Sequence, residues 1–304
     1  MRRAVGVALL AAVAAASSAA AQVMPMGGSL VRVWAIRYRA HDGFSRRAYV
    51  VLPAWYGPSD DPPLPLVISP HGRGITAREN VRFWGNLPAR GPFAVVNPEG
   101  QGRRLALYSW GDPGQIEDLA RMPAIVRRAL PWLRIARHRI YAVGGSMGGQ
   151  EALLLLARFP RLLAGVAAFD APTNLALRYR GFAELRDGAE LQELVRYEVG
   201  GTPGRDPRAY ALRSPLDFAR RIAFSGVPLQ LWWSVRDRIV RNGWTQSGAL
   251  YRLVKRLNPD APVVEFVGRW RHTADMRPRN RLPIALRRFG LLRPARLTVR
   301  RVRA

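Results

Sequence analysis

The sequence contains no cysteine, so the chain cannot form a disulfide bond, a thiolate nucleophile or a lipid anchor on an N-terminal cysteine. Histidine is scarce as well, and the few histidines lie far apart, without a ligand spacing such as H-x-x-x-H. They are His41, His71, His138 and His272. Because zinc sites usually need clustered ligands, we expect neither a catalytic metal nor a cofactor.

Acidic residues are also few. The chain has 21 of them against 48 basic residues, a formal net charge of +27, and almost all of the excess is arginine. Such a charge draws a protein to anionic surfaces such as envelope polymers or lipid headgroups, although a GC-rich genome produces the same arginine bias without selection. No recognition helix, RNP motif or basic stripe with interleaved aromatics indicates nucleic acid. We therefore expect no nucleic-acid partner and keep an anionic cell-envelope surface as a candidate partner.

Long apolar runs are absent except at the N-terminus. There, Arg2 and Arg3 precede an apolar stretch over residues 4–16, and Ala19-Ala20-Ala21 has the small-residue pattern of a cleavage site. The stretch is too short to span a bilayer. We predict a signal peptide over residues 1–21, with an uncleaved anchor as the alternative. The mature protein is then expected to be secreted, periplasmic or envelope-associated, without a transmembrane segment.

The remaining chain has the length and the apolar content of one α/β domain. Its 304 residues, 48% of them hydrophobic, suffice for a single core. Residues 31–39 and 46–52 predict an opening hairpin. Apolar strand patterns then alternate with helical ones, which predicts a mainly parallel sheet of about eight strands with helices on both faces. The strands are expected at 64–69, 93–97, 140–143, 165–169, 227–234 and 261–267, and the helices at 77–84, 117–133, 151–157 and 245–257.

We assign residues 22–292 to this catalytic domain and residues 293–304 to a basic C-terminal tail. The polar segment 171–213 interrupts the alternation and contains one predicted amphipathic helix over 182–197. It is expected to form a small cap that shapes the substrate pocket and excludes water. A solvated surface excursion is the alternative.

The most informative motif is Gly144-Gly145-Ser146-Met147-Gly148-Gly149. It follows the apolar strand pattern at 140–143 and precedes a helix pattern, and this order is the context of a G-x-S-x-G nucleophile elbow. A serine hydroxyl is a poor nucleophile, so a sharp turn must project it toward a base. Glycines at positions 144 and 148 leave room for that turn. Ser146 is the predicted nucleophile.

The base and the acid are predicted from their places after later strands. His272 follows the last predicted strand, and Asp237 follows the strand before it, where a carboxylate is well placed to orient an imidazole. The order Ser146, Asp237, His272 is that of the α/β-hydrolases. Asp170, at the end of the strand at 165–169, is the alternative acid; otherwise it caps the turn into the insertion.

Together these segments resemble the α/β-hydrolase superfamily, in its prolyl-oligopeptidase-like and secreted-esterase branch. The resemblance covers roughly residues 30–290 and rests on the segments 139–149, 214–219 and Asp237-Arg238-Ile239-Val240. It implies that the loop His71-Gly72-Arg73-Gly74 forms an oxyanion hole. The donors would be the amide of Met147 and that of Gly72 or Arg73, while the side chain of His71 is hydrogen-bonded inside the loop.

The expected activity is that of an exported serine hydrolase acting on a small-molecule or polymer ester through an acyl-enzyme. The resemblance favours esters because the related peptidases usually carry a β-propeller ahead of this domain. A peptidase or amidase and an acyltransferase on the same triad remain alternatives, and so does a polyanion-binding envelope protein without activity. Four aromatic residues near strand ends are candidates for the pocket wall: Trp84, Tyr108, Trp110 and Trp270.

Overall fold

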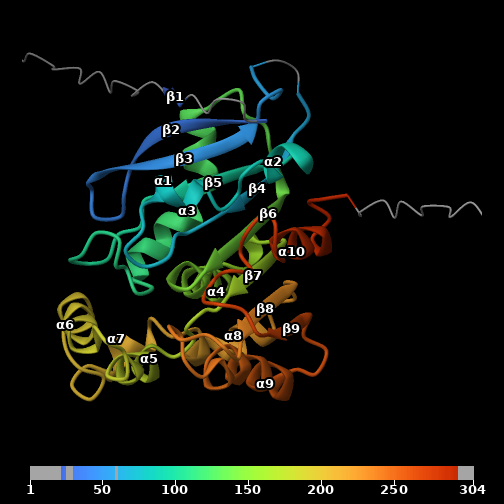
Figure 1. The fold of residues 1–304 in the computed structure, drawn as a ribbon. Coiled ribbons are helices and arrows are strands. Elements are labelled where there is room, and N and C mark those ends of the chain that lie inside the picture. The colour runs from blue at the N-terminus through green and yellow to red at the C-terminus, as the bar shows by residue number, and fades with distance from the viewer. Residues whose placement is uncertain (1–21, 25–29, 59–60, 294–304) are drawn as a thin grey trace, which may run out of the picture.

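The computed structural model describes residues 22–24, 30–58 and 61–293, so the predicted leader and the predicted tail from residue 294 onward lie outside the described residues. Within them, one sheet of nine strands runs through the molecule in the order β1-β2-β3-β5-β4-β6-β7-β8-β9 (Figure 1). The strands are β1 (Gln22–Met24), β2 (Val31–Arg39), β3 (Ser45–Pro53), β4 (Leu64–Ile68), β5 (Ala94–Pro98), β6 (Ile135–Gly145), β7 (Gly165–Phe169), β8 (Leu229–Ser234) and β9 (Val263–Gly268).

The expected mainly parallel sheet is confirmed. Strands β4 to β9 pair in parallel, whereas β1, β2 and β3 are joined to each other and to β5 by antiparallel pairing. The predicted hairpin is the β2–β3 pair, in which Tyr38 lies opposite Arg46. The described sheet has one strand more than the eight expected, because β1 adds an outer strand beside β2.

Helices cover both faces of the sheet, as expected. One face packs against α3 (Pro113–Ala129), α4 (Met147–Arg158), α8 (Ala219–Ala223) and α9 (Ser247–Leu257). The other face packs against α1 (Ala77–Val81), α2 (Leu87–Arg90) and α10 (Leu282–Arg288). Short 3-10 helices occur at Pro160–Leu162, Pro215–Phe218 and Gly243–Thr245. No helix among the described residues combines the length and the apolar character that a membrane crossing requires.

The insertion expected at 171–213 contains three helices where the sequence predicts one. They are α5 (Leu175–Phe182), α6 (Gly188–Val199) and α7 (Pro207–Ala211), and they form a group beside the sheet, below and to the left in Figure 1. Phe182, predicted to start a helix, instead ends α5. The helices have a small hydrophobic core of their own, to which Trp110 contributes from outside the insertion.

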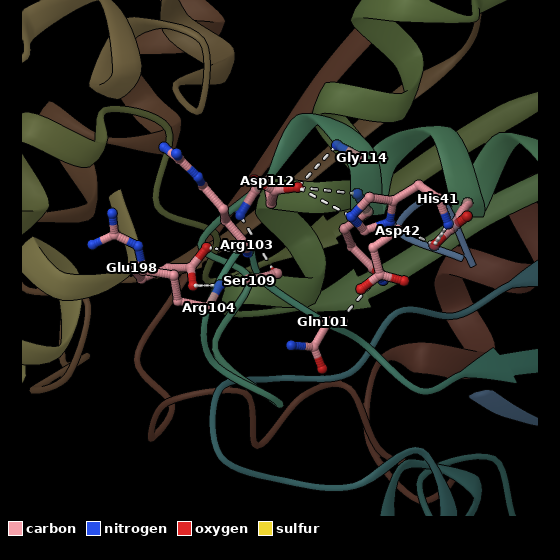
Figure 2. Close-up of polar contacts among 12 residues, drawn as sticks. His41, Asp42, Gln101, Arg103, Arg104, Ser109, Asp112, Gly114 and Glu198 are labelled. Atoms are coloured by element: carbon pink, nitrogen blue, oxygen red, sulfur yellow. Dashed lines mark hydrogen bonds and ion pairs between the residues drawn. The ribbon is translucent and has the colours of Figure 1, made fainter. Parts of the chain in front are cut away.

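A buried carboxylate joins this insertion to the main domain. Glu198, in α6, accepts the backbone amides of Arg103, Arg104 and Leu105 at 2.6, 2.8 and 2.9 Å. Figure 2 shows its side chain directed at this loop. Arg213 extends the network, because its guanidinium lies 2.8 Å from Asp112, which caps α3, and 3.5 Å from Glu198. Hydrogen bonds to a charged acceptor are strong, so we infer that they fix the position of α6.

A second buried carboxyl group leads to a stability prediction. Glu151, in α4, is fully buried against the hydroxyl of Ser109, and burial raises its pKa to about 8. Between the ordinary glutamate pKa and that value, the folded state keeps a proton that the unfolded state has lost. Stability should therefore be fully present in acid and should fall as pH rises toward 8.

Glu151→Gln removes this titration. From pH 5 to pH 8 the unfolding free energy of the wild type should therefore fall relative to that of the variant. The change is bounded by about 1.4 kcal/mol for each pH unit. Denaturant titrations at the two pH values measure it. Glu117→Gln, an exposed position on α3, is the control and should show no such trend. A difference that is the same at both pH values would contradict a protonated Glu151.

Candidate active site

Four neighbouring strands bring the predicted catalytic residues to one edge of the sheet. Ser146 follows β6 directly and Asp170 follows β7, while Asp237 and His272 lie in the loops after β8 and β9. The strands are parallel, and their register places their carboxyl ends side by side. Gly145 of β6 lies opposite Phe169 of β7, and Phe169 lies opposite Trp232 of β8. Ligand sites in open parallel sheets form at this carboxyl edge.

Ser146 has the strained backbone of a nucleophile elbow. Its φ is +56° and its ψ is −127°, a conformation that residues with a Cβ atom rarely adopt. The turn is packed backbone against backbone, since a Cβ atom on Gly148 would lie 2.2 Å from the carbonyl oxygen of Pro70. A Cβ atom on Gly144 would lie 2.3 Å from the oxygen of Gly148. The glycines predicted to permit the turn are therefore required by its contacts.

Asp237 and His272 form a direct hydrogen bond. The distance from His272 Nδ1 to Asp237 Oδ2 is 2.6 Å, and the other carboxylate oxygen accepts the amides of Ile239 and Val240 at 2.7 and 3.0 Å. A carboxylate can only accept, so Nδ1 of the imidazole carries the proton. Nε2 is then the basic nitrogen, and the ring is held in the tautomer that a general base needs.

Asp170 has different partners. Its carboxylate accepts the amide of Ser234 at 3.0 Å, the indole N–H of Trp270 at 2.9 Å and the amide of Thr273 at 2.7 Å. Burial, together with the nearby charge of Asp237, raises its pKa to about 6. The sequence predicted that Asp170 bonds amides in the turn that leads into the insertion, and this prediction is wrong. The donors belong instead to β8 and to the loop that carries His272. Asp170 holds that loop.

Three of these side chains also meet the distance condition for a metal. Asp170, Asp237 and His272 bring one ligand atom each within 4.8 Å of one another. Their oxygens, however, already accept the hydrogen bonds described above. The arrangement is that of a hydrogen-bonded acid and base, and the expectation that no metal binds stays a prediction.

His71 fixes the loop opposite the elbow. The ring is 1% exposed, its Nε2 accepts the amide of Gly100 at 2.7 Å, and its Nδ1 therefore donates to the carbonyl oxygen of Gly72 at 2.8 Å. Burial lowers the pKa of His71. The prediction of a hydrogen bond inside the loop is confirmed. Because a trans peptide is planar, anchoring this carbonyl directs the N–H of Arg73 the opposite way.

A pocket of about 310 Å³ contains both Ser146 and His272 in its wall. Of the four aromatic candidates for the pocket wall, Trp110 lines the pocket. Trp84 and Trp270 are buried elsewhere, and their indole N–H groups donate to Ser69 and Asp170, respectively. Tyr108 instead contacts Trp110 at 6.4 Å between ring centroids. The sequence did not indicate several further wall residues: Phe83, Arg178, Met276 and Arg277.

The chain is similar in structure to three kinds of hydrolase. The acylaminoacyl peptidase of Pyrococcus horikoshii superposes with a TM-score of 0.63 and 17% identity over 85% of this chain and 41% of that one. A fungal esterase of Rhizomucor miehei superposes with a TM-score of 0.65 and 15% sequence identity, over 86% of this chain and 83% of the esterase. The S-formylglutathione hydrolase of Staphylococcus aureus superposes with a TM-score of 0.61 and 15% sequence identity, over 86% of this chain and 100% of the hydrolase. The chain thus spans about two fifths of the peptidase.

Neither a protein-family model nor a curated protein sequence matches the chain. At these identities the structural likeness shows the fold. The chain therefore has the α/β-hydrolase fold, as the sequence motifs predict.

Proposed function

We propose that the protein is a serine hydrolase that cleaves carboxylic esters through an acyl-enzyme. The observation that carries the proposal is that His272, hydrogen-bonded to Asp237 at 2.6 Å, lies in the wall of the same pocket as Ser146 on its strained turn. In this mechanism His272 Nε2 takes the serine proton as the hydroxyl attacks the ester carbonyl, and then delivers it to the leaving alcohol. Asp237 supports the imidazolium, and water attacks the acyl-enzyme.

Two backbone amides are placed to hold the oxyanion. Met147 is the first residue of α4, where an amide has no acceptor within the helix. The loop of His71 supplies the second, and the orientation of its peptide favours the amide of Arg73 over that of Gly72. The loop lies close to the nucleophile, since a Cβ atom on Gly72 would lie 3.9 Å from the Cβ atom of Ser146.

An ester preference is supported by the lengths of the structural neighbours. The esterase and the S-formylglutathione hydrolase are covered over 83% and 100% of their chains, whereas the peptidase is covered over 41%. The test is a panel of p-nitrophenyl esters beside aminoacyl p-nitroanilides. We expect the esters to have the higher kcat/KM. Faster cleavage of the anilides would favour a peptidase, and turnover of neither would count against both.

We also propose that residues 1–21 direct export and that the arginine-rich surface holds the protein on anionic envelope material. Retention on vesicles that contain anionic lipid should then fall steeply between low and high salt, because screening weakens exposed charges. Turnover of a small neutral ester should barely change over the same range. Sedimentation with vesicles and a parallel ester assay measure the two quantities.

Truncation after Leu292 is the matched variant. It removes the predicted basic tail and should weaken retention while sparing turnover of the neutral ester. If turnover is lost together with retention, the arginine surface helps to build the site, and the proposed division between binding and catalysis is wrong.

A further inference from the structure

Three arginines line the pocket beside Ser146, and none of them has a carboxylate partner among the described residues. Arg277 lies over the ring of Phe83, 3.8 Å from its centroid, so the other two are the ones considered for a substrate. Arg73 comes from the loop opposite the elbow, and Arg178 comes from α5 in the insertion. Among the described residues, no carboxylate oxygen lies within 4.0 Å of either guanidinium. Their close contacts are aromatic: Arg178 lies 4.0 Å from the ring centroid of Phe182, and Arg73 lies 5.9 Å from that of Trp110.

The other two buried arginines of the described residues, Arg46 and Arg213, both have carboxylate partners. Arg46 lies beside Asp42 and Asp118. The side chain of Arg213, 5% exposed, is paired with the carboxylates of Asp112 and Glu198. Arg178 is equally buried, at 5%. Burial, together with the charge of Arg73, lowers its pKa to about 10, so that it remains a cation at neutral pH. An unpaired buried charge costs free energy, and an anion bound between the two guanidinium groups would offset that cost.

The rest of the pocket supports an anion with an apolar body. No aspartate or glutamate is among the described residues of its wall, which otherwise carries mostly apolar side chains around the nucleophile. Asp237 attracts Arg178 electrostatically, but hydrogen bonds from its own loop and from His272 occupy its oxygens. The exposed Asp187 and Glu190 act on Arg73 only at longer range.

A second hollow continues this positive character at the surface. It has a volume of about 960 Å³ and shares Ile239 and His272 with the inner pocket. Four exposed arginines line it: Arg236, Arg238, Arg269 and Arg271. The wall also contains Asp237, so positive charges outnumber negative ones four to one. A cleft with such an excess of one sign of charge raises the local concentration of ions of the opposite sign. Anionic substrates would therefore be drawn to the side of the site where the acid and the base lie.

We propose that the substrate is a carboxylate-bearing ester whose carboxylate binds between Arg73 and Arg178, with Arg178 as the residue that determines this specificity. The inference deepens the proposed function and rests on it. Arginine is suited to the role because its planar fork of donors matches a carboxylate and can bind it with two parallel hydrogen bonds. The linking chain of the substrate would pack on apolar surface such as Trp110 while its ester carbonyl meets Ser146.

The test compares mono-p-nitrophenyl glutarate with its methyl ester, which has the same scissile bond and no charge. Wild type should prefer the acid. In Arg178→Met the ratio of kcat/KM for acid over methyl ester should fall by about 10- to 100-fold, mainly through KM of the acid, as expected for a lost hydrogen bond to a charged group. Arg180→Met, two residues along α5 and exposed, removes the same charge and should leave the ratio nearly unchanged.

A binding measurement keeps the inference testable apart from turnover. At constant ionic strength, glutarate should raise the Tm of the wild type, whereas neutral glutaramide should not, and Arg178→Met should lose the effect. Failure of a fluorophosphonate to label Ser146 would overturn the proposed function, while glutarate stabilisation would still decide whether the pocket takes a carboxylate. Equal losses on both esters would overturn the specificity role, and so would a wild type that neither prefers the acid nor is stabilised by glutarate.

Discussion

Replacing Ser146 with alanine should lower kcat for ester hydrolysis on the order of 10⁶-fold, because the variant has no nucleophile to form the acyl-enzyme. The fold should survive. Alanine keeps the Cβ atom at the same positive φ, so it adds no backbone strain to the turn between β6 and α4. Steady-state turnover of a p-nitrophenyl ester and thermal unfolding of the same samples measure the two effects.

Ser225→Ala is a suitable control, because this serine lies after α8 and bonds only within its own turn. It should keep wild-type turnover. A folded Ser146→Ala variant whose turnover stays within about tenfold of the wild type would show that another group is the nucleophile.

Replacing Asp237 with asparagine should lower kcat by about 10⁴-fold at nearly unchanged structure. An asparagine oxygen can still accept the amides of Ile239 and Val240, but its NH₂ group would face His272 Nδ1. The imidazole would then be held with Nε2 protonated, which is the tautomer that cannot take the serine proton. Turnover as a function of pH and the crystal structure of the variant report the chemical and the structural effect.

Asp170→Asn is the matched comparison. It should reduce kcat much less than Asp237→Asn, and its main effect should be a lower Tm, because Asp170 bonds Trp270 and the amide of Thr273 rather than the imidazole. If the ranking of the two kcat losses is reversed, the role of the acid belongs to Asp170.

Much of the sheet and the position of Ser146 on a sharp turn could be predicted because their signals are local. The apolar run at 165–169 coincides with β7, and the glycines around Ser146 predict the turn that the structure has. Helix ends were harder. The helix expected at 117–133 is α3 over Pro113–Ala129, because Asp112 accepts the amides of Gly114 and Gln115 and starts the helix earlier.

Features that depend on distant contacts could not be read from the sequence. The preference for Arg73 over Gly72 as the proposed oxyanion donor depends on the ring of His71, which accepts the amide of Gly100 and donates to the carbonyl oxygen of Gly72. The three helices of the insertion pack on a core of their own that includes Trp110. Arg178 is one of 48 basic residues, and only its burial without a carboxylate partner distinguishes it.

Ser146 is proposed to be the nucleophile that carries the acyl group, and covalent labelling followed by mass spectrometry examines this role. The mature protein is incubated with a fluorophosphonate, digested and analysed by tandem mass spectrometry, with Ser146→Ala and Asp237→Asn treated in parallel. If Ser146 is the nucleophile, we expect one phosphonylated site at Ser146, slower labelling of Asp237→Asn and no labelling of Ser146→Ala. A label on another serine at the wild-type rate, or an unlabelled protein that still hydrolyses esters, would contradict it.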